Sequence, residues 1–293
     1  MDRRHTCVIV LALALVLASA PSRAARDETI TIGWASWASN EITARIARRV
    51  LEERLGVSVE LKNVDVAPMY RGVAAGFLDV MLAGWLPTAH AQYADEVGDR
   101  MVNLGILYEH ARMGWVVPAY IPESRLASMA DLADPDVRER LGGRIVGIEP
   151  GAGMTRISRR AIDVYGLEGY RLEIASSAGM VAALAEAIER REWIVVNGWN
   201  PHWMWGRWKL RYLQDPEGLF GRIERVHVLA RPRFYRDHVE AAAVLGRMWI
   251  PLAELQHALE RARQTTFEQA AAGYVADHAG RVDYWVTGRL PGD

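Results

Sequence analysis

One short pattern, Gly-Trp-x-Pro, occurs twice in this chain, each time at the end of an apolar run. The first copy is Gly84-Trp85-Leu86-Pro87, and the second is Gly198-Trp199-Asn200-Pro201. In both halves of the chain, two earlier β-rich runs and two helical periods come before this pattern. The order strand, helix, strand, helix, strand is typical of a parallel sheet flanked by helices. The duplication therefore predicts an α/β fold of two lobes that face each other across a cleft.

The expected elements can be placed along the chain by their periodicity. In the first half, strands are expected over residues 29–33, 57–61 and 79–83, with helices over 40–55 and 67–76. In the second half, strands are expected over 144–148, 170–175 and 193–197, with helices over 155–165 and 178–190. We interpret Asn200 as the N-cap and Pro201 as the first residue of a further helix, with Gly198 loosening the end of the strand before it.

Two stretches are expected to connect the lobes. Residues 119–143 are rich in Pro, Asp and Ser, which indicates a crossing between domains, and residues 226–230 look like a return crossing. Residues 239–285 are mostly helical by pattern. We therefore expect a clamshell of the periplasmic binding protein type with two hinge crossings. Lobe 1 would contain residues 25–117 and 227–293, and lobe 2 residues 118–226.

The N-terminus has the three parts of a secretory signal peptide. Arg3 and Arg4 precede an apolar run over residues 8–17, and small residues follow up to Ala24, where we expect cleavage. A membrane anchor would need a longer apolar run. The only cysteine, Cys7, lies in this segment, so the mature chain would have neither a disulfide nor a thiol nucleophile. We expect a soluble periplasmic protein.

Composition excludes some partners and leaves small ligands open. Apolar residues make up 51% of the chain, charged residues 24%, and the formal net charge is −1. This balance is ordinary for a globular protein and gives no footprint for nucleic acid. Because the charge is small and no charged tail is present, a highly charged macromolecular partner is not indicated.

Ligands of open parallel sheets bind beyond the carboxyl ends of the strands. In this chain that rule selects residues 34–37, 85–90, 149–154 and 199–203. Three of these segments contain tryptophan, and the fourth is a Gly-rich turn that opens a helix, which suits an anion. Aromatic faces attract a quaternary ammonium group by ~0.5–2 kcal/mol each. Singly, such residues are more often core, and Trp203 and Trp208 are expected to be packing, but together the segments predict a ligand with a cationic head and an anionic end.

Three of these stretches closely resemble motifs of the glycine betaine substrate-binding proteins of osmoprotectant ABC importers. They are residues 83–90, 147–154 and 198–204, and residues 113–118 and 210–216 match as well. The resemblance implies a cage of Trp37, Trp85 and Trp199 around a trimethylammonium group, with Trp34 as the alternative to Trp37. It also implies that the backbone N–H groups of Gly153 and Met154 and the side chain of His90 hold a carboxylate. No catalytic residue, metal or cofactor is implied.

The resemblance further implies a monomeric receptor that delivers glycine betaine to a membrane permease with a cytoplasmic ATPase. His90 favours a betaine, because the related choline-binding proteins lack a histidine at this point of the motif. Proline betaine, carnitine and choline stay open as ligands, and so does delivery to a chemoreceptor. A secreted choline-ester hydrolase is the rival from another class, but the chain has no Gly-x-Ser-x-Gly or His-Glu-x-x-His motif. A carbohydrate-binding protein is disfavoured, because few polar side chains flank the tryptophans.

Overall fold

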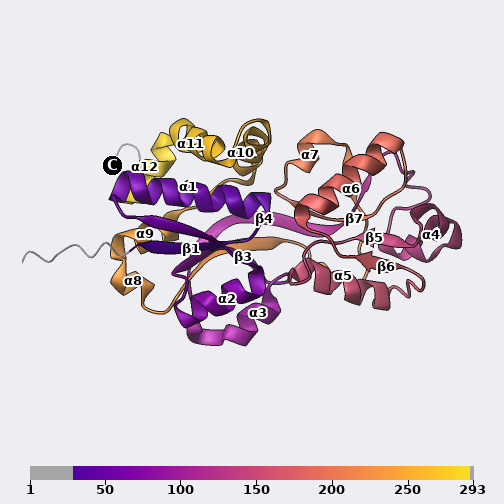
Figure 1. Ribbon diagram of the computed structural model, residues 1–293, viewed down its shortest axis with the longest axis horizontal. Helices are drawn as coiled ribbons and strands as arrows, with labels where there is room; N and C mark the ends of the chain where they lie inside the picture. The colour runs from indigo at the N-terminus through magenta and orange to yellow at the C-terminus, as the bar shows by residue number, and fades with distance from the viewer. Residues whose placement is uncertain (1–28, 291–293) are drawn as a thin grey trace, which may run out of the picture.

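The computed structural model describes residues 29–290, and it has two lobes joined through a continuous path of strands (Figure 1). The expected signal peptide, residues 1–24, and Cys7 lie outside the described residues. Along the path the strand order is β2-β1-β3-β9-β4-β7-β5-β6, and β8 pairs with β4 beside it. The two-lobed α/β fold expected from the sequence is therefore confirmed.

The first lobe is built on three parallel strands and one long antiparallel pair. Its strands are β1 (Ile30–Trp34), β2 (Val59–Asn63), β3 (Val80–Leu86), β9 (Glu224–Ala230) and the first part of β4 (Val102–Pro118). Strand β9 lies between β3 and β4 and runs antiparallel to both.

Helices cover both faces of this sheet. In Figure 1, α1 lies on one face beneath α10 and α11, while α2 and α3 lie on the other. The helices of this lobe are α1 (Ala38–Leu55), α2 (Val66–Ala75), α3 (Ala91–Val97), η1 (Gly98–Arg100), α8 (Phe234–Asp237), α9 (Val239–Arg247), α10 (Leu252–Gln264), α11 (Phe267–Asp277) and α12 (Ala279–Thr287). The apolar stripe of α1, including Ile42, Ile46 and Val50, is fully buried, as its helical spacing predicts.

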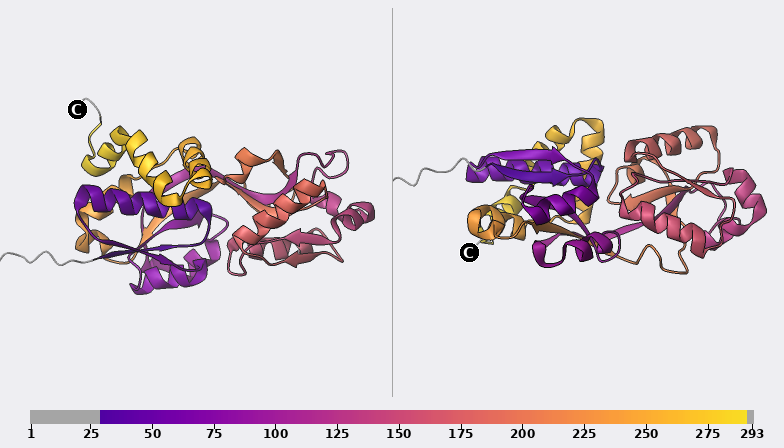
Figure 2. Two further views of the ribbon diagram at one scale, coloured as in Figure 1. Left: turned by 45° about the horizontal axis from the view of Figure 1, so that its top comes forward. Right: turned by 60° about the horizontal axis from the view of Figure 1, so that its bottom comes forward.

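The second lobe repeats the arrangement at a smaller scale. Strand β5 runs parallel to β6 and β7, whereas β7 and β8 run antiparallel to the second part of β4. Its elements are η2 (Met129–Ala133), α4 (Pro135–Leu141), β5 (Arg144–Val146), α5 (Gly153–Val164), β6 (Arg171–Glu173), α6 (Ser177–Arg190), β7 (Val196–Asn200), α7 (Met204–Arg207) and β8 (Leu210–Tyr212). Figure 2 shows the two lobes next to each other along the long axis of the molecule.

Strand β4 itself carries the chain from one lobe to the other. It pairs with β9 as far as Ala111, opposite Glu224, and with β7 from Arg112, opposite Asn200. The expectation that residues 119–143 form the crossing is therefore wrong, because η2 and α4 occupy that stretch. Residues 226–230 are likewise not a linker but part of β9. The division of the lobes at residues 117 and 227 stays a prediction.

The second Gly-Trp-x-Pro copy differs from expectation in its local structure. Asn200 ends β7 instead of capping a helix, and α7 begins only at Met204. The reason is that the Asn200 side-chain oxygen accepts the Arg112 N–H at 2.6 Å, which extends the pairing with β4. Gly198 lies inside β7, where a Cβ would come within 2.3 Å of a Val116 methyl group. Both copies contain a cis peptide bond before proline.

Candidate ligand-binding site

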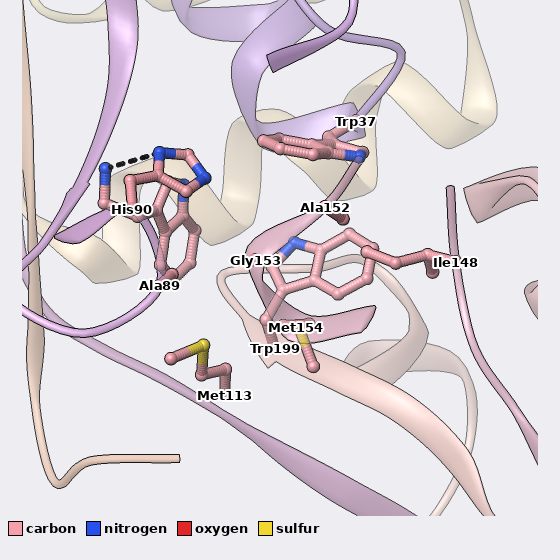
Figure 3. A pocket seen from close by; sticks show the side chains of 10 residues that line it. Trp37, Ala89, His90, Met113, Ile148, Ala152, Gly153, Met154 and Trp199 are labelled. Atoms are coloured by element: carbon pink, nitrogen blue, oxygen red, sulfur yellow. Dashed lines mark hydrogen bonds between the residues drawn. The ribbon is translucent and has the colours of Figure 1, made fainter. Parts of the chain in front are cut away.

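A cavity lined by buried residues lies between the lobes, at the carboxyl ends of β1, β3, β5 and β7. Its empty volume is about 320 Å³. All six residues expected at the site line it: Trp37, Trp85, His90, Gly153, Met154 and Trp199. Four further apolar residues complete the lining: Ala89, Met113, Ile148 and Ala152. In Figure 3 the rings of Trp37 and Trp199 lie one above the other, with His90 to one side and the two methionines below.

Three tryptophans from both lobes form aromatic walls, and all three are buried. Trp85 is the penultimate residue of β3, and its ring and that of Tyr108 meet edge to face, with 6.2 Å between the ring centres. Trp199 lies in β7 and is held by its neighbours: its carbonyl accepts the Trp205 indole N–H at 2.8 Å, and the His202 ring meets it edge-on at 4.8 Å. The faces of these rings can attract a cation that has no N–H donors.

The third wall is Trp37, whereas Trp34 does not line the cavity. Trp37 is the N-cap of α1, and its carbonyl accepts the N–H groups of Asn40 and Glu41 at 2.9 Å each. The turn before it is fixed by Asn40, which is buried. The Asn40 side chain accepts the Ala35 N–H at 2.7 Å and donates to the Leu82 carbonyl on β3 at 3.2 Å. An asparagine at the expected start of this helix was the one sequence signal for this turn.

Helix α5 begins with Gly153 and Met154, which also line the cavity. The N–H groups of Thr155 and Arg156 bond to the Ala152 carbonyl, but those of Gly153 and Met154 have no acceptor among residues 29–290. Because the first turn of a helix carries partial positive charge, two free N–H groups there suit an anion. Gly153 must lack a side chain, since a Cβ would lie 1.9 Å from the Ala89 carbonyl oxygen of the other lobe.

His90 is buried and neutral in this environment. Its Nδ1 accepts the Trp85 N–H at 3.3 Å, so the proton is on Nε2, and the Tyr70 hydroxyl lies 3.4 Å from Nδ1. Burial lowers the pKa of His90 to about 3; a bond with the Ala83 backbone opposes the shift, and the Arg156 charge adds to it. A neutral ring has one N–H, so a carboxylate that accepts a hydrogen bond from His90 must compete with the Ala83 carbonyl for it.

A buried carboxylate supports the loop that carries His90. The Glu224 oxygens, on β9, accept the N–H groups of Thr88 at 3.0 Å and Ala89 at 3.1 Å. Burial raises the pKa of Glu224, and these bonds oppose the rise. From the second lobe, the Arg156 guanidinium reaches the Ala89 carbonyl at 3.5 Å. The His90 end of the cavity therefore combines a helix N-terminus with a nearby cation.

The apolar lining residues and the groups that support the site were not predicted from the sequence. Met113 faces the cavity because β4 pairs it with Trp199, a register that no local pattern reveals. Ala89, Ile148 and Ala152 lie inside the motifs at residues 83–90 and 147–154, but small and aliphatic side chains carry no chemical signal. Trp203 and Trp208 do not line the cavity, and their rings lie 5.9 Å apart.

No group of three His, Cys, Asp or Glu side chains within residues 29–290 is placed to hold a metal ion. Over the same range, no helix has the length and apolar character needed to cross a membrane.

Two α/β lobes that enclose a small aromatic cavity define a clamshell ligand-binding protein. A family model described as the substrate binding domain of ABC-type glycine betaine transport system matches residues 28–277. The chain belongs to this family. It is a family of transport proteins that bind substrate, so the chain is a binding protein and not an enzyme.

Two solved structures are closely similar. One is lactococcal OpuAC in its closed-liganded conformation complexed with glycine betaine, with 30% identity and a TM-score of 0.82 over 88% of this chain and 99% of that one. The other is a glycine/betaine/L-proline-binding protein from Borrelia burgdorferi, with 29% identity and a TM-score of 0.83 over 88% of this chain and 97% of that one.

A curated relative is the glycine betaine/carnitine transport binding protein of Listeria monocytogenes, which is 30% identical over 166 residues. That alignment spans 55% of this chain and 55% of the relative.

Proposed function

We propose that this protein captures glycine betaine, or a closely related betaine, in the cavity between its lobes. The observation that carries the proposal is the convergence of two kinds of group on one cavity. Indole rings from both lobes offer aromatic faces to a quaternary ammonium, and the N-terminus of α5 offers two N–H groups to a carboxylate. A betaine has both groups in one small molecule.

The charges around the cavity support a betaine over choline. An anion beside Gly153 and Met154 would meet the positive end of a 12-residue helix, the His90 N–H and the field of Arg156. Choline has a hydroxyl where betaine has a carboxylate, and it would use only part of this field. Choline and carnitine receptors share the fold, and their ligands are the competitors to include in a binding test.

The decisive test is a titration of the purified protein, followed by tryptophan fluorescence and calorimetry. Glycine betaine, proline betaine, carnitine, choline and an uncharged sugar would be compared. We expect saturable binding of glycine betaine with a Kd in the micromolar range, about −8 kcal/mol, and weaker binding of choline. If no quaternary amine binds, the proposal is wrong.

The aromatic walls have their own test. We expect Trp85→Ala to weaken glycine betaine binding at least about tenfold, because it removes a cation–π face and opens the cavity. Trp34→Phe is the matched control, since Trp34 is a nearby tryptophan that does not line the cavity. Equal affinities for wild type and Trp85→Ala would exclude the proposed cage of Trp37, Trp85 and Trp199.

We also propose that the loaded protein acts outside the cytoplasmic membrane and hands its ligand to an ABC permease. Family membership and the expected signal peptide support this role. Deleting the gene should abolish uptake of labelled glycine betaine at low external concentration, and the wild-type gene should restore it. Normal uptake in the deletion strain would instead point to a sensory role or to a redundant importer.

A further inference from the structure

A single carboxylate in the second lobe reaches across to one of the aromatic walls. Glu149 follows β5 and is half-buried, and its Oε2 accepts the indole N–H of Trp37 at 3.1 Å. Its other oxygen, Oε1, accepts the backbone N–H of Ser177 at 2.7 Å. Glu149 therefore makes one bond within its own lobe and one bond to the other lobe.

The bond within the second lobe fixes the carboxylate in place. Ser177 is the first residue of α6, whose N-cap Ser176 accepts the Gly179 N–H at 3.0 Å. A carboxylate is favoured at this position, because the start of a helix has partial positive charge and unpaired N–H groups. The acceptor for Trp37 is thus held ready by groups that do not depend on lobe 1.

The bond across the lobes fixes the orientation of the Trp37 ring. The backbone of Trp37 is anchored as the N-cap of α1, so rotation about its side-chain bonds is the main freedom that remains. Indole has one polar hydrogen, and here Glu149 accepts it. Trp37 also lines a second cavity of about 540 Å³ that Glu149 borders, and the carboxylate lies at the N–H edge of the ring.

We propose that Glu149 is a positioning and specificity residue for the cationic end of the ligand; the inference rests on the proposed function. Glu149 holds Trp37 in place only when the lobes are together, which slows ligand release. Its negative charge, joined to the indole N–H, also strengthens the attraction between the ring and a cation. A neutral amide of the same shape has one acceptor oxygen, which can still hold the Trp37 ring but supplies no charge.

Two variants separate these effects. Glu149→Gln removes the charge and keeps one oxygen, which can accept the indole N–H but not the Ser177 N–H as well, whereas Glu149→Ala removes the charge and both acceptors. The matched control is Glu173→Gln, because Glu173 lies at the end of β6 in the same lobe and pairs with Arg144 at 3.4 Å without reaching the first lobe. Thermal melts of all the variants would establish that they are folded.

The probes are glycine betaine and 3,3-dimethylbutanoate, in which carbon replaces the cationic nitrogen. We expect Glu149→Gln to weaken glycine betaine binding about tenfold and to leave the binding of 3,3-dimethylbutanoate, whose tert-butyl end carries no charge, within about twofold of wild type. Glu149→Ala should speed the dissociation of both probes in stopped-flow measurements, with little change in the association rate. Glu173→Gln should match wild type throughout.

A double-mutant cycle tests whether Glu149 acts through Trp37. Trp37→Phe removes the N–H and keeps an aromatic ring, so its effect and that of Glu149→Ala should not add. Additive losses, or equal losses of both probes in Glu149→Gln, would overturn the inference while leaving the proposed function intact. If wild type itself binds no quaternary amine, the proposed function fails and the inference fails with it.

Discussion

At the scale of single residues, two buried histidines have different surroundings but the same charge state. His90 lines the cavity, and His202 lies beneath Trp199 with its Nδ1 accepting the Met204 N–H at 3.1 Å. Burial lowers the pKa of each to about 3. Both rings are therefore neutral donors and acceptors at neutral pH, and neither supplies a positive charge to the site.

His90 should distinguish ligands by their anionic end. We expect His90→Ala to weaken the binding of glycine betaine at least about tenfold, because a hydrogen bond to the ligand carboxylate is lost. The affinity for choline should fall much less, since choline has no carboxylate to accept that bond. Calorimetric titration of both ligands into the variant measures the difference. Equal losses for the two ligands would remove His90 from the proposed carboxylate site.

The buried histidines also predict how stability depends on pH. Their pKa is near 6.5 in the unfolded chain and about 3 in the fold, so the unfolded state binds more protons between these values. The free energy of unfolding should therefore fall as the pH drops below about 6.5. Each histidine contributes a slope of about 1.4 kcal/mol per pH unit until the pH reaches the folded pKa.

Urea unfolding of wild type and His202→Asn, measured from pH 7 to pH 4, would isolate one of these contributions. The asparagine oxygen can still accept the Met204 N–H but does not titrate. We expect a shallower pH dependence in the variant. Identical slopes would mean that His202 binds its proton as readily in the fold as in the unfolded chain.

At the scale of elements, the strand–helix boundaries determine where the site residues lie. The repeated pattern placed Trp85 and Trp199 at strand ends, and the structure has them at the end of β3 and within β7. The passage between the lobes was not predictable in the same way. A Pro- and Asp-rich composition resembles a linker, yet residues 119–143 pack as η2 and α4, because Asp134 and Pro135 start a helix. Long-range pairing, which no local pattern contains, decides that β4 makes the passage.

The site shows the same division between local and long-range information. The turn that opens α5 is visible as Gly151, Ala152 and Gly153, so an anion site could be expected there. The bond between Glu149 and Trp37 joins residues 112 positions apart and could not be expected. The Gln256 side chain likewise meets the backbone of His202 through two bonds, at 3.0 and 3.2 Å.

The start of α5 gives a prediction about closure. Gly153→Ala would place a Cβ against the Ala89 carbonyl of the other lobe, where backbone atoms cannot easily give way. We expect the affinity for glycine betaine to fall about a hundredfold or more, while the melting temperature without ligand stays within a few degrees of wild type. Gly151→Ala is the control, since nothing lies within 4 Å of its Cβ position. Normal binding by Gly153→Ala would show that the lobes need not approach this closely.

At the scale of the whole molecule, contacts between the lobes surround the cavity. Besides the bond between Glu149 and Trp37, the Tyr93 hydroxyl donates to the Gly151 carbonyl at 2.5 Å, and Gln256 bonds to His202. A ligand that touches both lobes adds to these contacts only when the lobes are together. Ligand binding and lobe closure should therefore be linked.

That linkage can be measured as thermal stabilisation. At a ligand concentration 100 times the Kd, the folded state gains about 2.7 kcal/mol. For a chain of this size, the melting temperature should rise by roughly 5–10 °C. Calorimetric melts with glycine betaine would show the rise, and small-angle scattering should show a smaller radius of gyration on binding. A rise in melting temperature with an unchanged radius would mean that the free protein is already closed.

The position of β9 has a consequence for biosynthesis. Strand β9 completes the sheet of the first lobe, but it follows every strand of the second lobe in the sequence. A chain that emerges from the ribosome or a translocation channel, N-terminus first, therefore exposes β3 and β4 without the strand that belongs between them. The second lobe can therefore fold first, and the sheet of the first lobe is completed only when β9 has emerged.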